Sequence, residues 1–207
     1  MNILKLCKAI AGTALLSFAL MHAPAKAAVD FNADPTTVFA LPGGTPIVSG
    51  DYTFLSTSWS AVVNGITMPY GVSNGTNMLV FANQGQLTVT RSDSGLFALN
   101  SLDAGGWLGL LAGNTARLSI TGHLQGGGQV SFSTPAGLSV TTFDHFTMLP
   151  SFTNLSSLTF SMVGYSSSAY AAIDNLVLTP VPEPETYALF LAGLGLMAAI
   201  ARRRRDS

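Results

Sequence analysis

The chain has 207 residues, of which 48% are hydrophobic and 9% are charged, and its formal net charge is −1. Within residues 28–180, two arginines stand against seven aspartates and no glutamate, which gives −5. No basic patch exists there, so the composition argues against nucleic-acid binding.

The first 27 residues have the parts of a secretory signal peptide. Lys5 and Lys8 supply the positive start, and residues 9–21 supply an apolar stretch that is too short for a comfortable membrane span. Ala25-Lys26-Ala27 offers a small-x-small cleavage site. We therefore predict cleavage between Ala27 and Ala28, with cleavage one residue later as the alternative.

The only cysteine, Cys7, lies inside this predicted signal peptide, in a poor context for a lipid anchor. The mature protein therefore enters an oxidising compartment without a thiol. Disulfides, thiolate catalysis and cysteine-ligated zinc are excluded. Residues 28–180, which we call the cargo, are long enough for one domain with its own hydrophobic core.

Short runs of alternating apolar and polar residues recur between turn residues in the cargo, which favours an all-β fold. Asn64-Gly65 and Asn74-Gly75 are favourable type I′ hairpin pairs, and Gly126-Gly127-Gly128 is a further turn. About ten strands without an amphipathic helix predict a two-sheet β-sandwich, with a closed barrel as the alternative. The clearest expected strands are 77–82, 86–91, 117–121, 129–133, 157–162 and 169–178, the last with a bulge or twist near Asp174.

Catalytic groups are sparse in the cargo. Glycoside hydrolysis needs two carboxylates facing one cleft, whereas these aspartates are expected to sit singly in separate turns. Asp144 and His145 are adjacent on the chain, so on a strand their side chains point to opposite faces and form no dyad. His123 precedes the glycine turn and is expected to be a solvated turn residue. We predict a non-enzymatic protein without catalytic residues.

Aromatic side chains are the groups that stack on sugar rings. Trp107 follows Gly105-Gly106, which suggests a loop or strand edge, so we name it as the candidate glycan contact. Burial in the core is the alternative, and it is favoured for Trp59. Further candidates are Tyr52, Tyr70, Tyr165 and Tyr170.

The C-terminal tail has three parts in order. Pro182 and Pro184 lack backbone donors, so residues 179–184 are expected to be extended. The uncharged run 187–201 follows, and as a helix it would cover roughly 22 Å of the roughly 30 Å hydrocarbon core. Four arginines come next, which favour the cytoplasmic side. We predict a short transmembrane helix over 187–201 with the cargo outside; a buried helix with a basic tail is the alternative.

The order of Val181-Pro182-Glu183-Pro184, an apolar helix and Arg202, Arg203, Arg204 and Arg205 resembles the PEP-CTERM protein-sorting signal. The resemblance covers residues 181–207 and implies recognition by an exosortase, an integral-membrane cysteine protease of transpeptidase type. It also implies a bacterial envelope with exopolysaccharide, and removal of the tail after a transient stay at the inner membrane. It implies nothing about the activity of the cargo.

A second resemblance rests on the ordered segments 97–105, 118–122, 126–130, 152–158 and 172–176. They are similar to a cargo type of PEP-CTERM proteins that resembles carbohydrate-binding jelly-roll domains. This resemblance implies a single jelly-roll-like β-sandwich and a structural calcium held by Asp30 or Asp34 together with Asp174. An Asx-type hydrogen bond between Asp174 and a turn amide is the alternative.

Three functions remain open at this point. The first is a structural or adhesive protein of the envelope or extracellular matrix, whose partners are signal peptidase, the exosortase, the inner membrane and polysaccharide. The second is a glycan-binding module, which needs an exposed aromatic platform or groove. The third is a secreted hydrolase, which needs convergent acid and base groups. Only the first needs no feature beyond those visible in the sequence.

Overall fold

The computed structural model describes residues 27–36, 41–66, 70–165, 168–182 and 184–204. The predicted signal peptide up to residue 26, together with Glu183 and Arg205, lies outside the described residues. The elements in chain order are β1 (Ala27–Val29), β2 (Pro46–Ser49), β3 (Tyr52–Ser56), β4 (Ser60–Asn64), β5 (Asn77–Ala82), β6 (Gln86–Arg91), β7 (Phe97–Gly106), β8 (Arg117–Leu124), β9 (Gln129–Ser133), β10 (Asp144–Thr147), β11 (Leu155–Val163), β12 (Tyr170–Pro180) and α2 (Pro184–Arg203).

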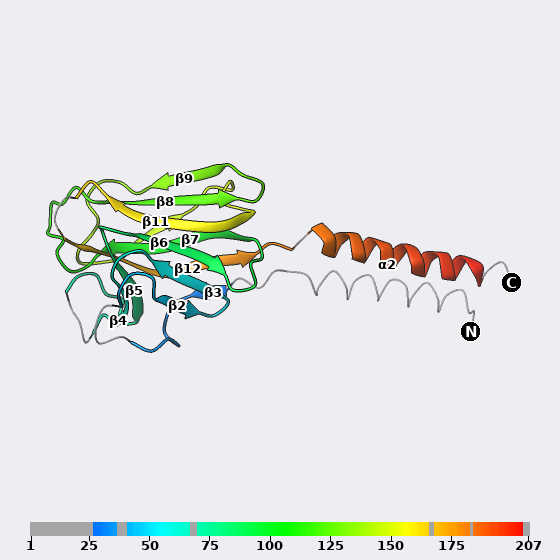
Figure 1. The fold of residues 1–207 in the computed structure, drawn as a ribbon, viewed down its shortest axis with the longest axis horizontal. Coiled ribbons are helices and arrows are strands. Elements are labelled where there is room, and N and C mark those ends of the chain that lie inside the picture. The colour runs from blue at the N-terminus through cyan, green and yellow to red at the C-terminus, as the bar shows by residue number, and fades with distance from the viewer. Residues whose placement is uncertain (1–26, 37–40, 67–69, 166–167, 183, 205–207) are drawn as a thin grey trace, which may run out of the picture.

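The strands form one curled antiparallel sheet that folds back on itself as two layers (Figure 1). The first layer has the order β2-β3-β6-β11-β8-β9, and the second has the order β10-β7-β12-β5-β4, with β1 beside β12. A single residue pair, Leu155 with Phe97, joins β11 to β7. Among the described strands β9 pairs with β8 alone and β10 with β7 alone, so the sheet stays open. The predicted all-β sandwich is confirmed and the closed barrel is wrong.

The core lies between the two layers, where the alternating pattern places it. Leu87 and Val89 of β6, Ile120 of β8 and Phe160 of β11 are all buried in one hydrophobic cluster with residues of β7 and β12. Their neighbours on each strand point outward because successive side chains alternate across a strand. Burial of large side chains of this kind is the main stabilising contribution in a chain without disulfides.

The predicted strand limits are confirmed for β5, β6 and β9, and β8, β11 and β12 run two or more residues further. The irregularity expected near Asp174 is also present. The register of β12 against β7 shifts between Asp174 and Val177, and Asn175 has a positive φ of 49°. Asparagine tolerates this left-handed conformation better than most residues.

The two predicted Asn-Gly hairpins are wrong. Asn64 is the last residue of β4 and Gly75 lies just before β5, so both pairs belong to one long connection between these strands. Gly75 does take a positive φ of 84°. The described residues between the two pairs, 66 and 70–73, belong to no strand.

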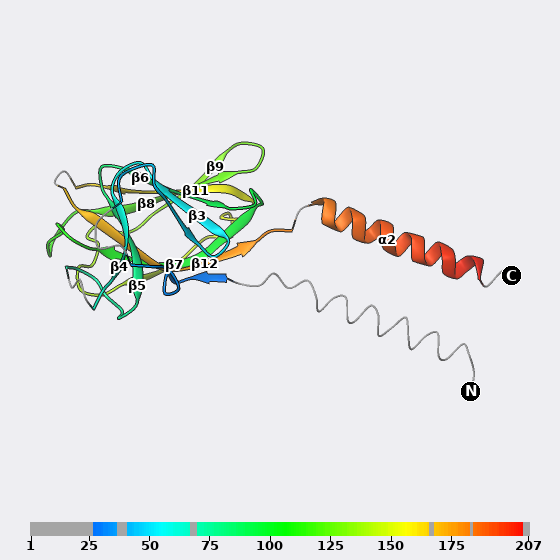
Figure 2. The ribbon, with the colours of Figure 1, turned by 60° about the horizontal axis from the view of Figure 1, so that its bottom comes forward.

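The two ends of the cargo lie side by side. Ala27 pairs with Leu178 and Val29 with Leu176, so β1 runs antiparallel to the last residues of β12. Figure 2 shows α2 continuing from β12 away from the sandwich, next to the point at which β1 begins. The predicted cleavage site at Ala27 and the tail therefore leave the sandwich at the same end.

Candidate functional site

Trp107 lies in an aromatic cluster on the outer face of the second layer. The ring contacts Tyr70 and Tyr170 edge-to-face, with centroid distances of 6.0 and 5.9 Å. Gly71 allows this packing, because a Cβ there would come within 2.5 Å of the Trp107 Cα atom. Trp107 is 7% exposed and Tyr70 61% exposed, so Tyr70 presents its surface to solvent. A glycan contact at Trp107 remains a prediction, and little of the side chain is accessible for it.

The other aromatic candidates are placed differently. Tyr52 is buried in the core beside Phe97, and burial raises the pKa of its hydroxyl to about 12. Tyr165 donates its hydroxyl to the Gly109 carbonyl. Trp59, for which burial was favoured, is half exposed in the connection from β3 to β4.

Replacement of Trp107 by phenylalanine is expected to change the free energy of unfolding by no more than about 1 kcal/mol. The indole Nε1 is buried without a hydrogen-bond partner among the described residues, so its removal relieves an unpaired donor. Trp107→Ala removes the packed ring as well and is expected to cost about 3–5 kcal/mol. Urea unfolding of both variants measures this difference. Equal losses would mean that Nε1 is bonded in solution.

The Trp107→Ala variant tests the predicted glycan contact, because phenylalanine would still offer an aromatic ring to a sugar. If the alanine variant keeps its fold and is retained on exopolysaccharide as well as the unmodified protein, Trp107 has no place in a glycan site.

Asp174 lies at the centre of a buried polar network beneath the connection from β4 to β5. Its Oδ2 atom accepts hydrogen bonds from Asn74 Nδ2 at 2.8 Å and from Thr76 Oγ1 at 3.1 Å, and its Oδ1 atom accepts the Asn175 backbone N–H at 2.8 Å. Burial is the main reason that the pKa of Asp174 is raised to about 6, with a smaller contribution from the charge of Asp30, because the hydrogen bonds offset only part of these effects.

The carboxylates predicted to hold calcium lie in one region of the fold. Asp30 directly follows β1, which places it beside the irregular part of β12. Asp34 lies in the next turn, where one of its carboxylate oxygens is buried without a partner among the described residues. These hard oxygens suit Ca²⁺, which would compensate both the orphaned oxygen and the buried carboxyl.

Calcium at this place nevertheless remains a prediction. Within the described ranges, no three histidine, cysteine, aspartate or glutamate side chains lie together in a way that could hold a metal. An ion held by Asp174 with Asp30 or Asp34 would therefore need backbone carbonyls or water as further ligands. The turn-amide hydrogen bond of the alternative is present at Asn175.

His145 pairs with Asp103 and not with its chain neighbour Asp144. The Nδ1 atom of His145 lies 2.6 Å from Asp103 Oδ1, and Asp103 Oδ2 accepts the Asn175 side-chain amide at 2.8 Å. His145 and Asp103 face each other across β10 and β7. The expectation that all aspartates lie in turns is wrong, because Asp103, Asp144 and Asp174 are strand residues. Asp103 and His145 are 42 positions apart in the sequence, so no local pattern could reveal this contact.

Asp103 and Asp174 do not face one open cleft, as two carboxyls of a glycosidase must. They are opposite each other on β7 and β12, but Asp174 has no exposed surface. Substrate cannot reach it under Asn74 and Thr76. His123 lies in β8 and not in the expected turn. Thr159 and Gln129 contact its two ring nitrogens, so its role in the fold is structural.

The C-terminal tail continues directly from β12. Pro180 still pairs with Phe97, and the Val181 N–H donates to the Leu96 carbonyl before the chain leaves the sandwich. Helix α2 then begins at Pro184, a favourable first position for proline because its missing N–H is not needed there. Leu189, Leu191 and Leu196 are each at least 65% exposed, so the alternative of a helix buried against the cargo is wrong.

Residues 180–205 match the PEP-CTERM protein-sorting motif. The helix and arginines of this PEP-CTERM motif are thus presented beyond the last strand of the cargo (Figure 1). Among the described residues, no helix combines the length and apolar character that a membrane crossing requires. The predicted span over 187–201 therefore remains a prediction.

No curated protein matches the chain significantly. Among solved structures, it is similar to TmCBM61 in complex with β-1,4-galactotriose, with 9% identity and a TM-score of 0.37 over 63% of this chain and 88% of that one. It is also similar to the family 11 carbohydrate-binding module of a cellulosomal cellulase of Clostridium thermocellum (13%, TM-score 0.39, 78% and 98% covered) and to an exo-β-agarase (13%, 0.45, 77% and 25%). TM-scores below 0.5 leave the function of the cargo beside the PEP-CTERM motif undecided.

Proposed function

We propose that this chain is an exported, non-enzymatic protein of the bacterial cell envelope or extracellular matrix, sorted through its PEP-CTERM motif and associated with exopolysaccharide. Signal peptidase removes residues 1–27, an exosortase acts at the tail, and the inner membrane holds the protein only between these steps. The observation that carries the proposal is the exposed apolar helix with terminal arginines that continues from β12.

The position of the chain ends supports this sequence of events. Because β1 lies beside β12, the signal peptide and the tail emerge from the same end of the sandwich. Both segments can therefore lie in one membrane with the folded cargo on its outer side.

Glycan binding by the cargo is the second candidate function, and the outer face of the first layer favours it. Thr88, Thr159, Thr121 and Ser131 are aligned across β6, β11, β8 and β9. We call this row and its flanking Ser and Thr residues the hydroxyl face. None of the six strands of this layer contains an aspartate or glutamate. This face carries no carboxylate from its strands, although the exposed Arg117 at the start of β8 lies on the same side. Its hydroxyl groups suit polar polymers, with little net gain from each hydrogen bond.

Fractionation of producing cells tests the proposal. The protein is expected to co-fractionate with exopolysaccharide in a producing strain, and to be lost from that fraction in a strain whose polysaccharide synthesis is disabled. Recovery in the membrane fraction of both strains would contradict it. Purified protein added from outside separates the two functions: a glycan-binding module is retained on isolated polysaccharide, whereas a protein attached only through sorting is washed away.

A further inference from the structure

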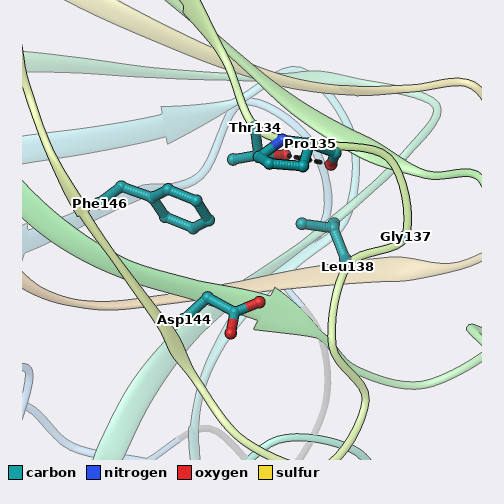
Figure 3. A pocket seen from close by; sticks show the side chains of 6 residues that line it. All are labelled: Thr134, Pro135, Gly137, Leu138, Asp144 and Phe146. Carbon is teal, nitrogen blue, oxygen red and sulfur yellow. Dashed lines mark hydrogen bonds between the residues drawn. The ribbon is translucent and has the colours of Figure 1, made fainter.

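A cavity of about 360 Å³ opens at the side of the sandwich where β9 and β10 leave the two layers unjoined. Figure 3 shows its lining, with the Phe146 ring, the Leu138 side chain and the Asp144 carboxylate around one space. Its volume is at the lower end of the range for small-ligand pockets, which is room for one or two sugar rings. The remaining lining residues are Thr134, Pro135 and Gly137.

The pairing of β10 fixes which side chains face this cavity. His145 is opposite Asp103 and points to the outer face, where the two interact. Asp144 is opposite Ala104, a buried core residue, so Asp144 and Phe146 point to the inner side. A carboxylate thus stands at the open rim of the hydrophobic core. No donor among the described residues forms a hydrogen bond or ion pair with it.

The cavity places the apolar ring of Phe146 beside the carboxylate oxygens of Asp144. Phe146 is half-buried and held by Phe132 at a ring-centroid distance of 6.0 Å. Leu138 continues the apolar surface, and the Asp144 carboxylate offers about four acceptor positions. Pyranose rings have complementary features, since their C–H faces are apolar and their hydroxyl groups are donors.

We propose that this cavity binds a terminal residue of a neutral polysaccharide, with the ring against Phe146 and two hydroxyls donating to Asp144. This site rests on the proposed association with exopolysaccharide and gives that association a defined contact. It lies at the edge of the sandwich, shares no lining residue with the Trp107 cluster, and uses residues from β10 and from the segment that follows β9.

Saturation-transfer NMR of the exported protein with the methyl glycosides of glucose, galactose, mannose and glucosamine tests the site. At least one neutral glycoside is expected to receive saturation on its ring C–H protons. Asp144→Asn is expected to weaken that binding about tenfold, because hydrogen bonds to a charged acceptor are stronger than those to an amide. Phe146→Leu keeps the apolar volume and is expected to weaken binding as well.

Asp51→Asn is the matched control, since Asp51 is an exposed carboxylate at the β2–β3 turn and should leave binding unchanged. Absence of saturation on all neutral glycosides, binding of the cationic glucosaminide alone, or unchanged affinity in Asp144→Asn each overturns the site. Self-association of Asp144→Asn without any change in sugar binding also overturns it, and would assign the inward carboxylate to protection of an open sheet edge.

The failure of this site is distinguishable from the failure of the proposed function. Asp144→Asn should be exported and processed at the tail like the unmodified protein, as read by its intact mass. If Asp144→Asn is processed normally but loses sugar binding, both proposals are supported. If the unmodified protein co-fractionates with polysaccharide but binds none of the neutral glycosides, only the cavity site is overturned.

Discussion

Replacing the four C-terminal arginines with serine is expected to abolish processing of the PEP-CTERM motif and release the intact chain to the outside. Each arginine costs about 2.5–3.5 kcal/mol at the bilayer centre, so four form a barrier of roughly 10 kcal/mol to full translocation. Serine removes most of this barrier, and the short apolar helix does not hold the chain alone. Mass spectrometry of the cell-free medium is the measurement.

A lysine replacement of the same four residues is the control. Lysine keeps the positive charge and should therefore keep the orientation of the tail. Normal processing of the lysine variant with loss in the serine variant assigns the effect to charge. Loss in both variants would mean that the guanidinium groups themselves are recognised. Normal processing of the serine variant would contradict the role given to the arginines.

Asp174 is expected to make the metal-free protein less stable by about 3 kcal/mol as the pH rises from 3.8 to about 6. Burial raises the pKa of its carboxyl in the folded state, so the folded protein binds this proton more tightly than the unfolded chain. The resulting stabilisation is fully present below pH 3.8 and is lost as the pH rises through about 6.

Asp174→Asn isolates this contribution, since the other carboxylates are common to both proteins. Urea unfolding in a chelator at several pH values should show the free energy of unfolding of the unmodified protein falling relative to that of Asp174→Asn by about 3 kcal/mol as the pH rises through about 6. Parallel pH profiles would show that the Asp174 carboxyl is not perturbed.

Calcium extends the same experiment. If Asp30, Asp34 and Asp174 hold the ion, millimolar calcium should raise the melting temperature at neutral pH, where it compensates the ionised carboxyl. An unchanged melting temperature between chelator and calcium would remove the predicted metal site and leave the hydrogen bonds of Asn74, Thr76 and Asn175 as the whole explanation of this network.

The regular part of the fold is visible in the sequence because inward and outward residues alternate along β6 and β9 with a period of two, and because β5 is a continuous apolar run that is buried on both faces. The short edge strand β10 carries no such pattern, since three of its four residues are exposed and polar. Strand β1 was missed for another reason: its three residues coincide with the predicted cleavage site. Such strands exist only because a longer strand beside them offers hydrogen-bonding partners.

The candidate sites divide in the same way. The tail is a contiguous motif, so residue order alone predicts it. The Asp103–His145 pair, the network around Asp174 and the cavity at Asp144 depend on strand register between distant segments. The burial of Trp107 depends on the 70–72 segment lying over it, which Gly71 permits but no periodicity indicates.

The intact mass of the protein isolated from the extracellular matrix tests the central claim most directly. The account predicts a chain that begins at Ala28, or one residue later, and lacks the residues that follow roughly the Pro-Glu-Pro motif. A mass that retains Arg202, Arg203 and Arg204 would contradict sorting with tail removal and would identify the chain as a protein that keeps its C-terminal helix.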